Sequence, residues 1–216
     1  MLWSEEFSCH YWTQDLYGSQ STYIDAVHGF VGTALPLIRG RALLAEADWA
    51  AWQGCIENTV LRTATWEGGQ ANWRARLTSL PGKPLLMQYC HGAPGFLICL
   101  ADMPGHALDD VLIAAGDAVW AAGPLTKGSN LCHGTGGNGY AFLKLYARTR
   151  DAIWLQRARA FAVHGIAQTE ALTQKYGKMR YSLWTGDPGF AIFLWDCLRG
   201  RAAFPTLDVF DGLTAA

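Results

Sequence analysis

The chain has little net charge and little charge of either sign. Lysine and arginine number 17 and aspartate and glutamate 18, and charged residues make up 16% of the sequence. Without a basic excess or a basic cluster, the sequence does not favour binding to nucleic acid or to an anionic membrane. No stretch approaches the roughly 18 apolar residues of a membrane-spanning helix. The first residues carry charges where a secretory signal needs an apolar run. A cytoplasmic location is therefore expected.

Cysteine occurs six times, and its meaning depends on that location. In a secreted protein, six cysteines would suggest three disulfides. In a cytoplasmic chain of this size they favour metal binding or simple burial. Apolar residues make up 50% of the sequence, which is enough for a packed core. The length fits a single domain over residues 1–216.

An internal repeat organises the chain. A short glycine motif occurs four times, and the fourth copy is degenerate. The copies read His28-Gly29-Phe30-Val31-Gly32, His91-Gly92-Ala93-Pro94-Gly95, His133-Gly134-Thr135-Gly136-Gly137 and Thr185-Gly186-Asp187-Pro188-Gly189. Their first glycines stand at positions 29, 92, 134 and 186, so successive copies are 63, 42 and 52 residues apart. Such steps accommodate a helical hairpin and a loop of variable length.

Each motif precedes an apolar run with helical spacing, and amphipathic stretches lie between the runs. A run that is apolar nearly all round is typical of a helix buried among others. Residues 107–122 carry one apolar stripe that ends at Gly123-Pro124, and residues 151–167 carry another with Asp151 as the expected N-cap. This alternation predicts an all-α double layer of helical hairpins, with the glycine motifs opening the inner helices. Residues 68–84 are expected to form a long connecting loop.

Two copies of the motif carry cysteine directly before the histidine, as Cys90-His91 and Cys132-His133. Thiolate and imidazole suit zinc, and three protein ligands leave a fourth position for water or a substrate thiol. Two cysteines 42 residues apart are a less specific sign of a metal site than a pair of CxxC motifs. The prediction of a metal site therefore depends on the position that Cys90 and Cys132 share within the repeat. The alternative is that two small buried cysteines happen to precede glycine turns.

The repeat also draws attention to His28, Lys127 and the glycines. His28 holds the register of the other motif histidines without a preceding cysteine. It is either a proton donor or base near the metal, or a hydrogen-bonded core histidine. Lys127 either steadies an anionic substrate group or is a solvated loop lysine. The glycines allow tight turns and leave helix N-terminal N–H groups directed at one region, which favours an anion there.

Taken together, these motifs resemble those of the LanC and LanC-like proteins. The strings similar to the family's two zinc-loop motifs are Cys90-His91-Gly92-Ala93-Pro94-Gly95 and Leu131-Cys132-His133-Gly134-Thr135-Gly136-Gly137-Asn138-Gly139-Tyr140-Ala141-Phe142-Leu143. Lys127-Gly128 and the later Tyr181-Ser182-Leu183-Trp184 resemble the family as well. The similarity is strongest over residues 23–210 and covers most of the chain.

The resemblance implies an α/α toroid with zinc at its centre. It implies that Cys90, Cys132 and His133 are the zinc ligands, with His91 beside the first of them. The implied function is zinc-dependent activation of a thiol, from a peptide cysteine or from glutathione. The thiol is then added to dehydroalanine or dehydrobutyrine to form a thioether.

The same resemblance assigns roles to further residues. His28 and His91 are the expected acids that protonate the enolate, and Lys127 and Arg180 are the expected basic residues near the substrate. The expected partners are the thiol and the dehydroamino-acid substrate, with no nucleic acid and no membrane.

The chain departs from the family pattern in length. Family members are near twice as long and have seven hairpins, whereas this sequence offers about four, which match the C-terminal ones. The family's N-terminal portion carries an acidic residue implicated in catalysis, and no residue here is assigned that role. The alternative function is therefore a non-catalytic zinc-binding fragment or interaction module, with a homo-oligomer or a separate N-terminal half as partner. An α/α-toroid glycosidase ranks last, because it needs two carboxylates about 5–10 Å apart and only Asp187 sits at a motif loop.

Overall fold

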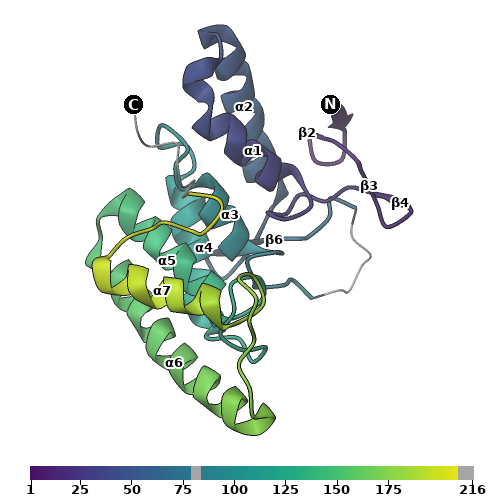
Figure 1. The fold of residues 1–216 in the computed structure, drawn as a ribbon. Helices are drawn as coiled ribbons and strands as arrows, with labels where there is room; N and C mark the ends of the chain where they lie inside the picture. Colours follow the sequence, from purple (N-terminus) through teal and green to yellow (C-terminus); the bar gives the residue numbers. More distant parts are fainter. Residues whose placement is uncertain (79–83, 209–216) are drawn as a thin grey trace. The chain divides into compact units, whose positions relative to one another are not determined.

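The computed structural model describes residues 1–78 and 84–208, and these are mostly helical (Figure 1). The α-helices are α1 (Phe30–Arg39), α2 (Glu46–Thr63), α3 (Ala93–Leu100), α4 (Asp109–Ala122), α5 (Thr135–Thr149), α6 (Ala152–Tyr176) and α7 (Asp187–Arg199). A short 3-10 helix, η1, spans Arg41–Leu43. The helical fold class predicted from the sequence is confirmed. Among the described residues, none of these helices combines the length and the apolar character needed to cross a membrane.

Short strands form three antiparallel hairpins, which the sequence analysis did not predict. They are β1 (Leu2–Ser4) with β2 (Cys9–Tyr11), β3 (Gln14–Leu16) with β4 (Ser19–Ser21), and β5 (Ala64–Glu67) with β6 (Gln70–Trp73). The prediction of a connecting loop over residues 68–84 is therefore wrong at Gln70–Trp73, which form strand β6. Gly68 and Gly69 both have positive φ, 55° and 79°, so this pair forms a tight hairpin turn and not a break. Residues 79–83 of that stretch lie outside the described residues.

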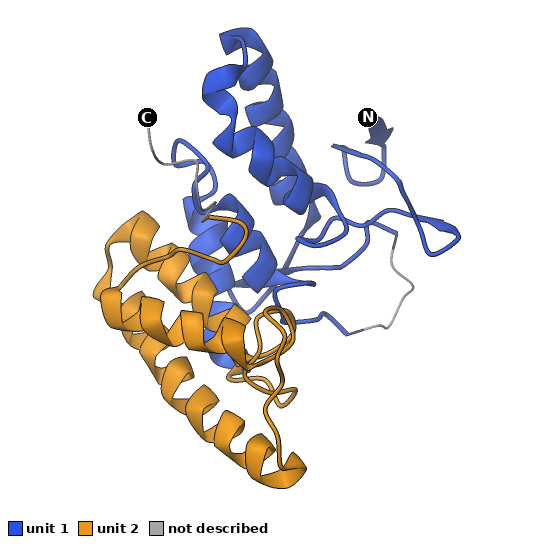
Figure 2. Ribbon diagram, in the orientation of Figure 1, with its two compact units in different colours: residues 1–122 blue, residues 123–216 orange. Residues whose placement is uncertain are grey.

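The chain folds as two compact units, residues 1–122 and residues 123–216 (Figure 2). The single domain expected from the sequence stays a prediction.

Unit 1 is built around α3, whose eight residues are all buried. Helices α1 and α4 pack against α3, and β6 packs against α4. The indole of Trp73 on β6 stacks on the ring of Phe96 on α3, with 4.2 Å between ring centroids. The indole N–H donates to the carbonyl of Val60 at 2.9 Å, so this large side chain is buried with its polar atom satisfied. Helix α3 is therefore buried on every side, as the apolar run after the second glycine motif predicts.

Unit 2 is a hairpin of α5 and α6 with α7 packed against both. Every residue from 135 to 145 of α5 is buried, and Phe142 meets Phe161 of α6 edge to face at 5.0 Å between ring centroids. The carboxylate of Asp151 accepts the backbone N–H of Ile153 at 3.0 Å. The predicted N-cap of α6 is therefore confirmed.

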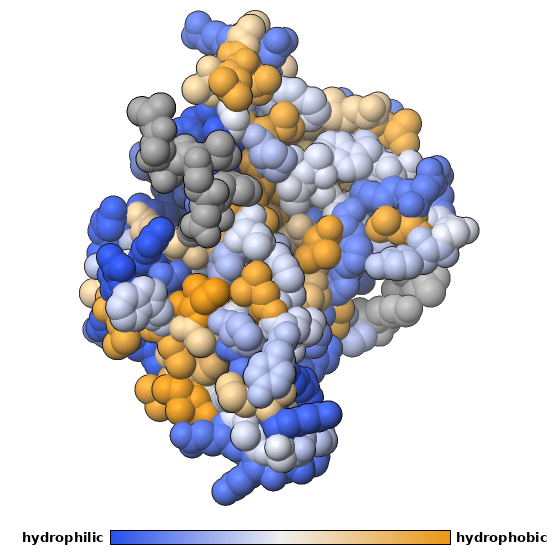
Figure 3. Space-filling model, in the orientation of Figure 1, coloured by the Kyte–Doolittle hydropathy of each residue, from blue (hydrophilic) through white to orange (hydrophobic). Residues whose placement is uncertain are grey.

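Helix α7 differs from the expectation that the inner helices are buried on all sides. Phe190 and Phe193 are buried, but Trp195 is 56% exposed and Leu198 is 74% exposed. Hydrophobic side chains accordingly reach the surface over α7 (Figure 3). This helix is buried on one face only, and the predicted homo-oligomer or separate partner half stays a prediction.

A buried polar pair links α5 to α7 and yields a pH-dependent prediction. The hydroxyl of Tyr140 donates to Oδ2 of Asp196 at 2.8 Å, and both residues are buried. Burial raises the pKa of Asp196, and the hydrogen bond from Tyr140 opposes that rise. Tyr140→Phe is expected to lower the free energy of unfolding by about 1.5–3 kcal/mol at pH 7, because an ionised carboxylate loses its hydrogen bond.

The loss in Tyr140→Phe should shrink at low pH. Without the hydroxyl, the folded-state pKa of Asp196 rises further above its unfolded value of 3.8. The penalty is therefore full where the carboxyl is ionised and fades as the pH falls through the folded-state pKa. Denaturant unfolding at pH 7 and pH 4 measures this difference, with the half-buried Tyr146→Phe as control on the same helix. An equal loss at both pH values would contradict the assignment.

Candidate functional site

The four glycine motifs build four loops of one design. The first glycine of each motif is the N-cap of a helix: Gly29 for α1, Gly92 for α3, Gly134 for α5 and Gly186 for α7. In each case a Cβ on that glycine would clash with the backbone of the residue six positions earlier. For Gly92 the clash is with the carbonyl oxygen of Leu86 at 2.0 Å, and φ is +105°. The loop folds back onto its own glycine, which explains why these positions need glycine, and the predicted repeat is confirmed.

The loops also occupy the N–H groups that open the helices. In α1 the backbone N–H groups of Phe30, Val31 and Gly32 donate to the carbonyls seven residues earlier, each at 3.2 Å. The first three N–H groups of α5 do the same, at 2.9–3.3 Å. The expectation that these N–H groups attract an anion is therefore wrong for α1 and α5. The reason is local, because the preceding loop supplies the acceptors that a bound anion would supply.

A polar side chain four residues before the first glycine closes three of the loops. Oδ1 of Asp25 accepts the backbone N–H of Val27 at 3.0 Å and that of His28 at 2.7 Å. In the third copy, Oδ1 of Asn130 accepts the N–H of His133 at 3.0 Å. In the fourth, Oγ of Ser182 accepts the N–H of Thr185 at 3.4 Å. A side-chain acceptor at this position therefore closes the turn in three of the four copies, as in Asx and ST turns.

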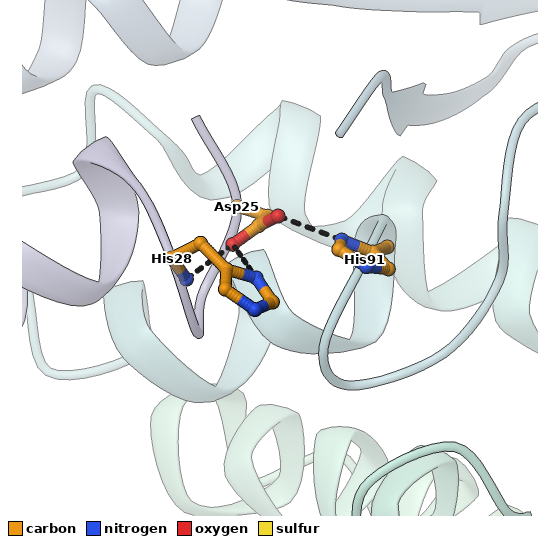
Figure 4. A group of neighbouring side chains, drawn as sticks. All are labelled: Asp25, His28 and His91. Atoms are coloured by element: carbon orange, nitrogen blue, oxygen red, sulfur yellow. Dashed lines mark hydrogen bonds and ion pairs between the residues drawn. The ribbon is translucent and has the colours of Figure 1, made fainter. Parts of the chain in front are cut away.

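Asp25 also brings together the two histidines expected to act as acids (Figure 4). Its Oδ2 lies 2.6 Å from Nδ1 of His91. Its Oδ1 lies 3.5 Å from Nδ1 of His28, but this second approach makes no hydrogen bond, and Nδ1 of His28 is buried without a partner. The two imidazole rings stack, with centroids 5.4 Å apart and planes 15° apart. The Asp25 side chain is fully buried, whereas the histidine side chains are 21% and 19% exposed.

Asp25 was not among the residues predicted for the site. It lies outside the glycine motifs that contain the histidines, and no acidic residue was predicted there. A signal was present in the repeat: Asp25 holds the register of Asn130 and Ser182 but alone of these carries a charge. Among the described residues, Asp25, His28 and His91 form a group whose nitrogen and oxygen atoms lie within 4.8 Å of one another, close enough to hold a metal ion.

The predicted zinc ligands are divided between the two units. Cys90 lies in unit 1 and is buried, and the side-chain amide of Gln88 donates to its Sγ at 3.1 Å. Cys132 and His133 lie together in unit 2, both half-buried. The N–H of Cys132 donates to the carbonyl of Trp184 at 2.9 Å, which ties the third loop to the fourth. All three residues keep the loop register predicted for them, and no disulfide occupies either thiol.

The predicted substrate-binding residues both lie in unit 2 and are exposed. Lys127 stands on the loop before Cys132. The backbone N–H of Arg180 donates to Oδ2 of Asp187 at 2.7 Å, and the N–H of Asp187 donates back to the carbonyl of Arg180 at 2.9 Å. Arg180 lines a small cavity of 170 Å³ together with Lys178 and other residues at the start of α7 and the end of α6. Two cations therefore line this cavity beside one carboxylate.

Comparison with known proteins places these features in a family. Over 140 residues, 59% of this chain, the sequence is 36% identical to the zebrafish (Danio rerio) glutathione S-transferase LANCL1, of which the match covers 32%. Over 118 residues, 51% of the chain, it is 36% identical to the Arabidopsis thaliana LanC-like protein GCL1, of which the match covers 27%. The fold resembles that of nisin cyclase with a TM-score of 0.62 and 18% identity, over 84% of this chain and 48% of that one. The chain thus spans well under two thirds of each relative. Residues 11–209 match the family of lanthionine synthetase C-like proteins, and the chain belongs to that family.

Proposed function

We propose that this chain is a zinc-dependent LanC-like protein that adds a thiol to dehydroalanine or dehydrobutyrine and so forms a thioether. The observation that carries the proposal is the position of Cys90 and Cys132, which precede the histidine in two loops of one design. Membership of the family supports it. One relative is named a glutathione S-transferase, and that name fits transfer of a thiol sulfur. The cytoplasm remains the proposed location.

The side chains present fit zinc. Two thiols and one imidazole are a ligand set that zinc prefers, and three ligands leave one position open. The amide of Gln88 donates to Sγ of Cys90, and such a contact orients a metal ligand. When bound, zinc would lower the pKa of a substrate thiol from roughly 8.5 and supply a thiolate at neutral pH.

The remaining chemistry falls to the chain's own residues. The thiolate sulfur forms a bond to the β-carbon of the alkene, and the π electrons move to the α-carbon as an enolate. His28 or His91 then gives a proton to the α-carbon, and the proton released by the thiol restores the histidine. The net change is addition of S–H across C=C, without oxidation or reduction. General acids at such a step typically accelerate it by roughly 10²–10⁴-fold.

Lys127 and Arg180 are the proposed contacts for anionic groups of the substrate. Glutathione carries two carboxylates and a peptide carries others, and a guanidinium can bind a carboxylate through two hydrogen bonds. The exposed position of both side chains leaves them accessible to such a group. Arg180 is the better placed of the two, because its backbone is fixed on both sides by Asp187 and it borders a cavity.

The direct experiment is to incubate the zinc-loaded chain with glutathione and a dehydroalanine peptide and to follow the product by mass spectrometry. The proposal expects a peptide heavier by one glutathione, formed faster than in buffer alone. A chain that binds zinc yet gives no acceleration with glutathione or with a peptide cysteine would support the alternative, a non-catalytic zinc-binding module.

A further inference from the structure

Asp25 carries a charge that its role in the turn does not need. Its Oδ1 closes the first loop by accepting two backbone N–H groups. The same register is held by the uncharged Asn130 and Ser182, and each closes its loop with a neutral oxygen. An asparagine or a serine would therefore suffice for the turn at position 25. The carboxylate must be explained by what its second oxygen does.

The second oxygen reaches a residue in a different repeat. Oδ2 of Asp25 lies 2.6 Å from Nδ1 of His91, which is 66 positions further along the chain. A carboxylate only accepts hydrogen bonds, so Nδ1 of His91 must be the donor. In the neutral ring, Nε2 is then the nitrogen without a proton. The Asp25 side chain is fully buried, and a hydrogen bond to a charged group is strong where water is excluded.

His28 completes the arrangement from the other side. Its Nδ1 faces Oδ1 of the same carboxylate at 3.5 Å (Figure 4). Its ring contacts that of Tyr23, at 4.9 Å between centroids, and that of His91, at 5.4 Å, and the Tyr23 and His91 rings are 6.2 Å apart, so the three rings form a cluster. Because both Nδ1 atoms are turned toward Asp25, both Nε2 atoms lie on the far sides of the rings. Both partly exposed histidines therefore direct Nε2 away from the buried carboxylate of Asp25.

We propose that Asp25 is a positioning residue that fixes the orientation and tautomer of His91 and holds His28 beside it. In this arrangement Nε2 of His91, like that of His28, is the ring atom left to exchange a proton with the substrate. The proposal deepens the proposed function and rests on it for the identity of the reaction. It gives this chain a carboxylate partner for its histidines, from a turn position that the sequence analysis did not assign.

A metal ion held by the same three residues is the competing explanation, and the distances disfavour it. Ligand atoms bound tetrahedrally to zinc at about 2.0–2.2 Å are separated by about 3.3–3.6 Å. The separation of Nδ1 and Oδ2, 2.6 Å, is that of a hydrogen bond instead. Oδ1 is already used by two backbone N–H groups. The hydrogen-bonded cluster is therefore favoured, and a metal ion here becomes an outcome of the test.

The test is Asp25→Asn in the full, zinc-loaded chain. Asparagine keeps the turn, as Asn130 does in the third copy, but its amide nitrogen cannot accept the hydrogen bond from Nδ1 of His91. NMR of the ¹⁵N-labelled histidines is expected to show His91 with its proton on Nδ1 in the parent and to lose that signature in the variant. The value of kcat for thioether formation is expected to fall by roughly 10²-fold or more, with little change in KM, since a misoriented imidazole affects the proton-transfer step.

The matched control is Asp109→Asn. Asp109 also pairs with Nδ1 of a histidine, His106 at 2.7 Å, but at the exposed start of α4. This variant should leave the His91 signal, zinc content and kcat unchanged. Asp25→Ser, which copies Ser182 of the fourth loop, is the second variant and should behave like Asp25→Asn.

Each other outcome is decisive. An unchanged His91 tautomer in Asp25→Asn overturns the proposal, as does loss of cooperative unfolding in both Asp25 variants, which would make the carboxylate a requirement of the fold. Loss of a zinc equivalent in Asp25→Asn would identify a metal site and overturn it too. If the tautomer changes as expected but the parent forms no thioether, the positioning role stands and the proposed function fails.

Discussion

Replacing His28 by asparagine is expected to slow thiol addition by roughly 10²–10⁴-fold while leaving zinc bound. The variant removes a proposed proton donor whose ring stacks on that of His91 and contacts that of Tyr23. The turn survives, because its hydrogen bond to Asp25 comes from the backbone N–H of residue 28, which the variant keeps. Initial rates from mass spectrometry and the zinc content of the same sample measure the two effects.

The control for this variant is His106→Asn, because the His106 side chain is 94% exposed and lies outside the glycine motifs. It should change neither rate nor zinc content. Loss of zinc from His28→Asn would reassign His28 as a ligand. An unchanged rate with unchanged zinc would return it to the role of a core histidine.

Replacing Cys132 by alanine is expected to abolish tight zinc binding, from about one zinc per chain in the parent. Removing one of three protein ligands leaves too few donors to hold the ion. Cys99→Ala and Cys197→Ala should keep the metal, because both cysteines are buried on helices α3 and α7. Burial raises the pKa of Cys197 to about 12, so that thiol stays protonated and is a poor ligand. Elemental analysis of the purified variants measures the zinc.

The zinc result also separates the two interpretations of the cysteine motifs. Equal zinc in Cys132→Ala and the parent would mean that the cysteines are small buried residues preceding glycine turns. Loss of zinc with Cys99→Ala but not with Cys132→Ala would place the metal elsewhere. Unfolding curves for each variant show whether a loss of metal comes from a loss of fold.

The helices could be predicted from the sequence because their signals are local. The glycine motifs mark helix starts, since a glycine at the N-cap lets the preceding loop fold back, as at Gly92 against Leu86. Asp151 was recognisable as an N-cap because the type of side chain and the start of an apolar stripe suffice. Both features depend on a few neighbouring residues, so no tertiary information was needed.

The hairpins and Asp25 could not be predicted, for different physical reasons. Strand β6 is short, and its assignment depends on Trp73 packing against Phe96, a contact 23 positions away in the chain. Asp25 looks like an ordinary turn residue, and its second role depends on a histidine from another loop. Comparing the register of all four copies would have singled out its charge, but only the loop geometry shows what the charge contacts.

The proposed role of zinc in this chain is to activate a thiol for addition to a dehydroamino acid. This role is tested by the initial rate of thioether formation from glutathione and a dehydroalanine peptide, measured on one sample in three states: zinc-loaded, stripped with a chelator, and reloaded with zinc. We expect a rate above the reaction in buffer for the loaded chain, a fall to the buffer rate on stripping, and recovery on reloading. A stripped chain that keeps the full rate, or a loaded chain that never exceeds the buffer rate with either thiol, would contradict it.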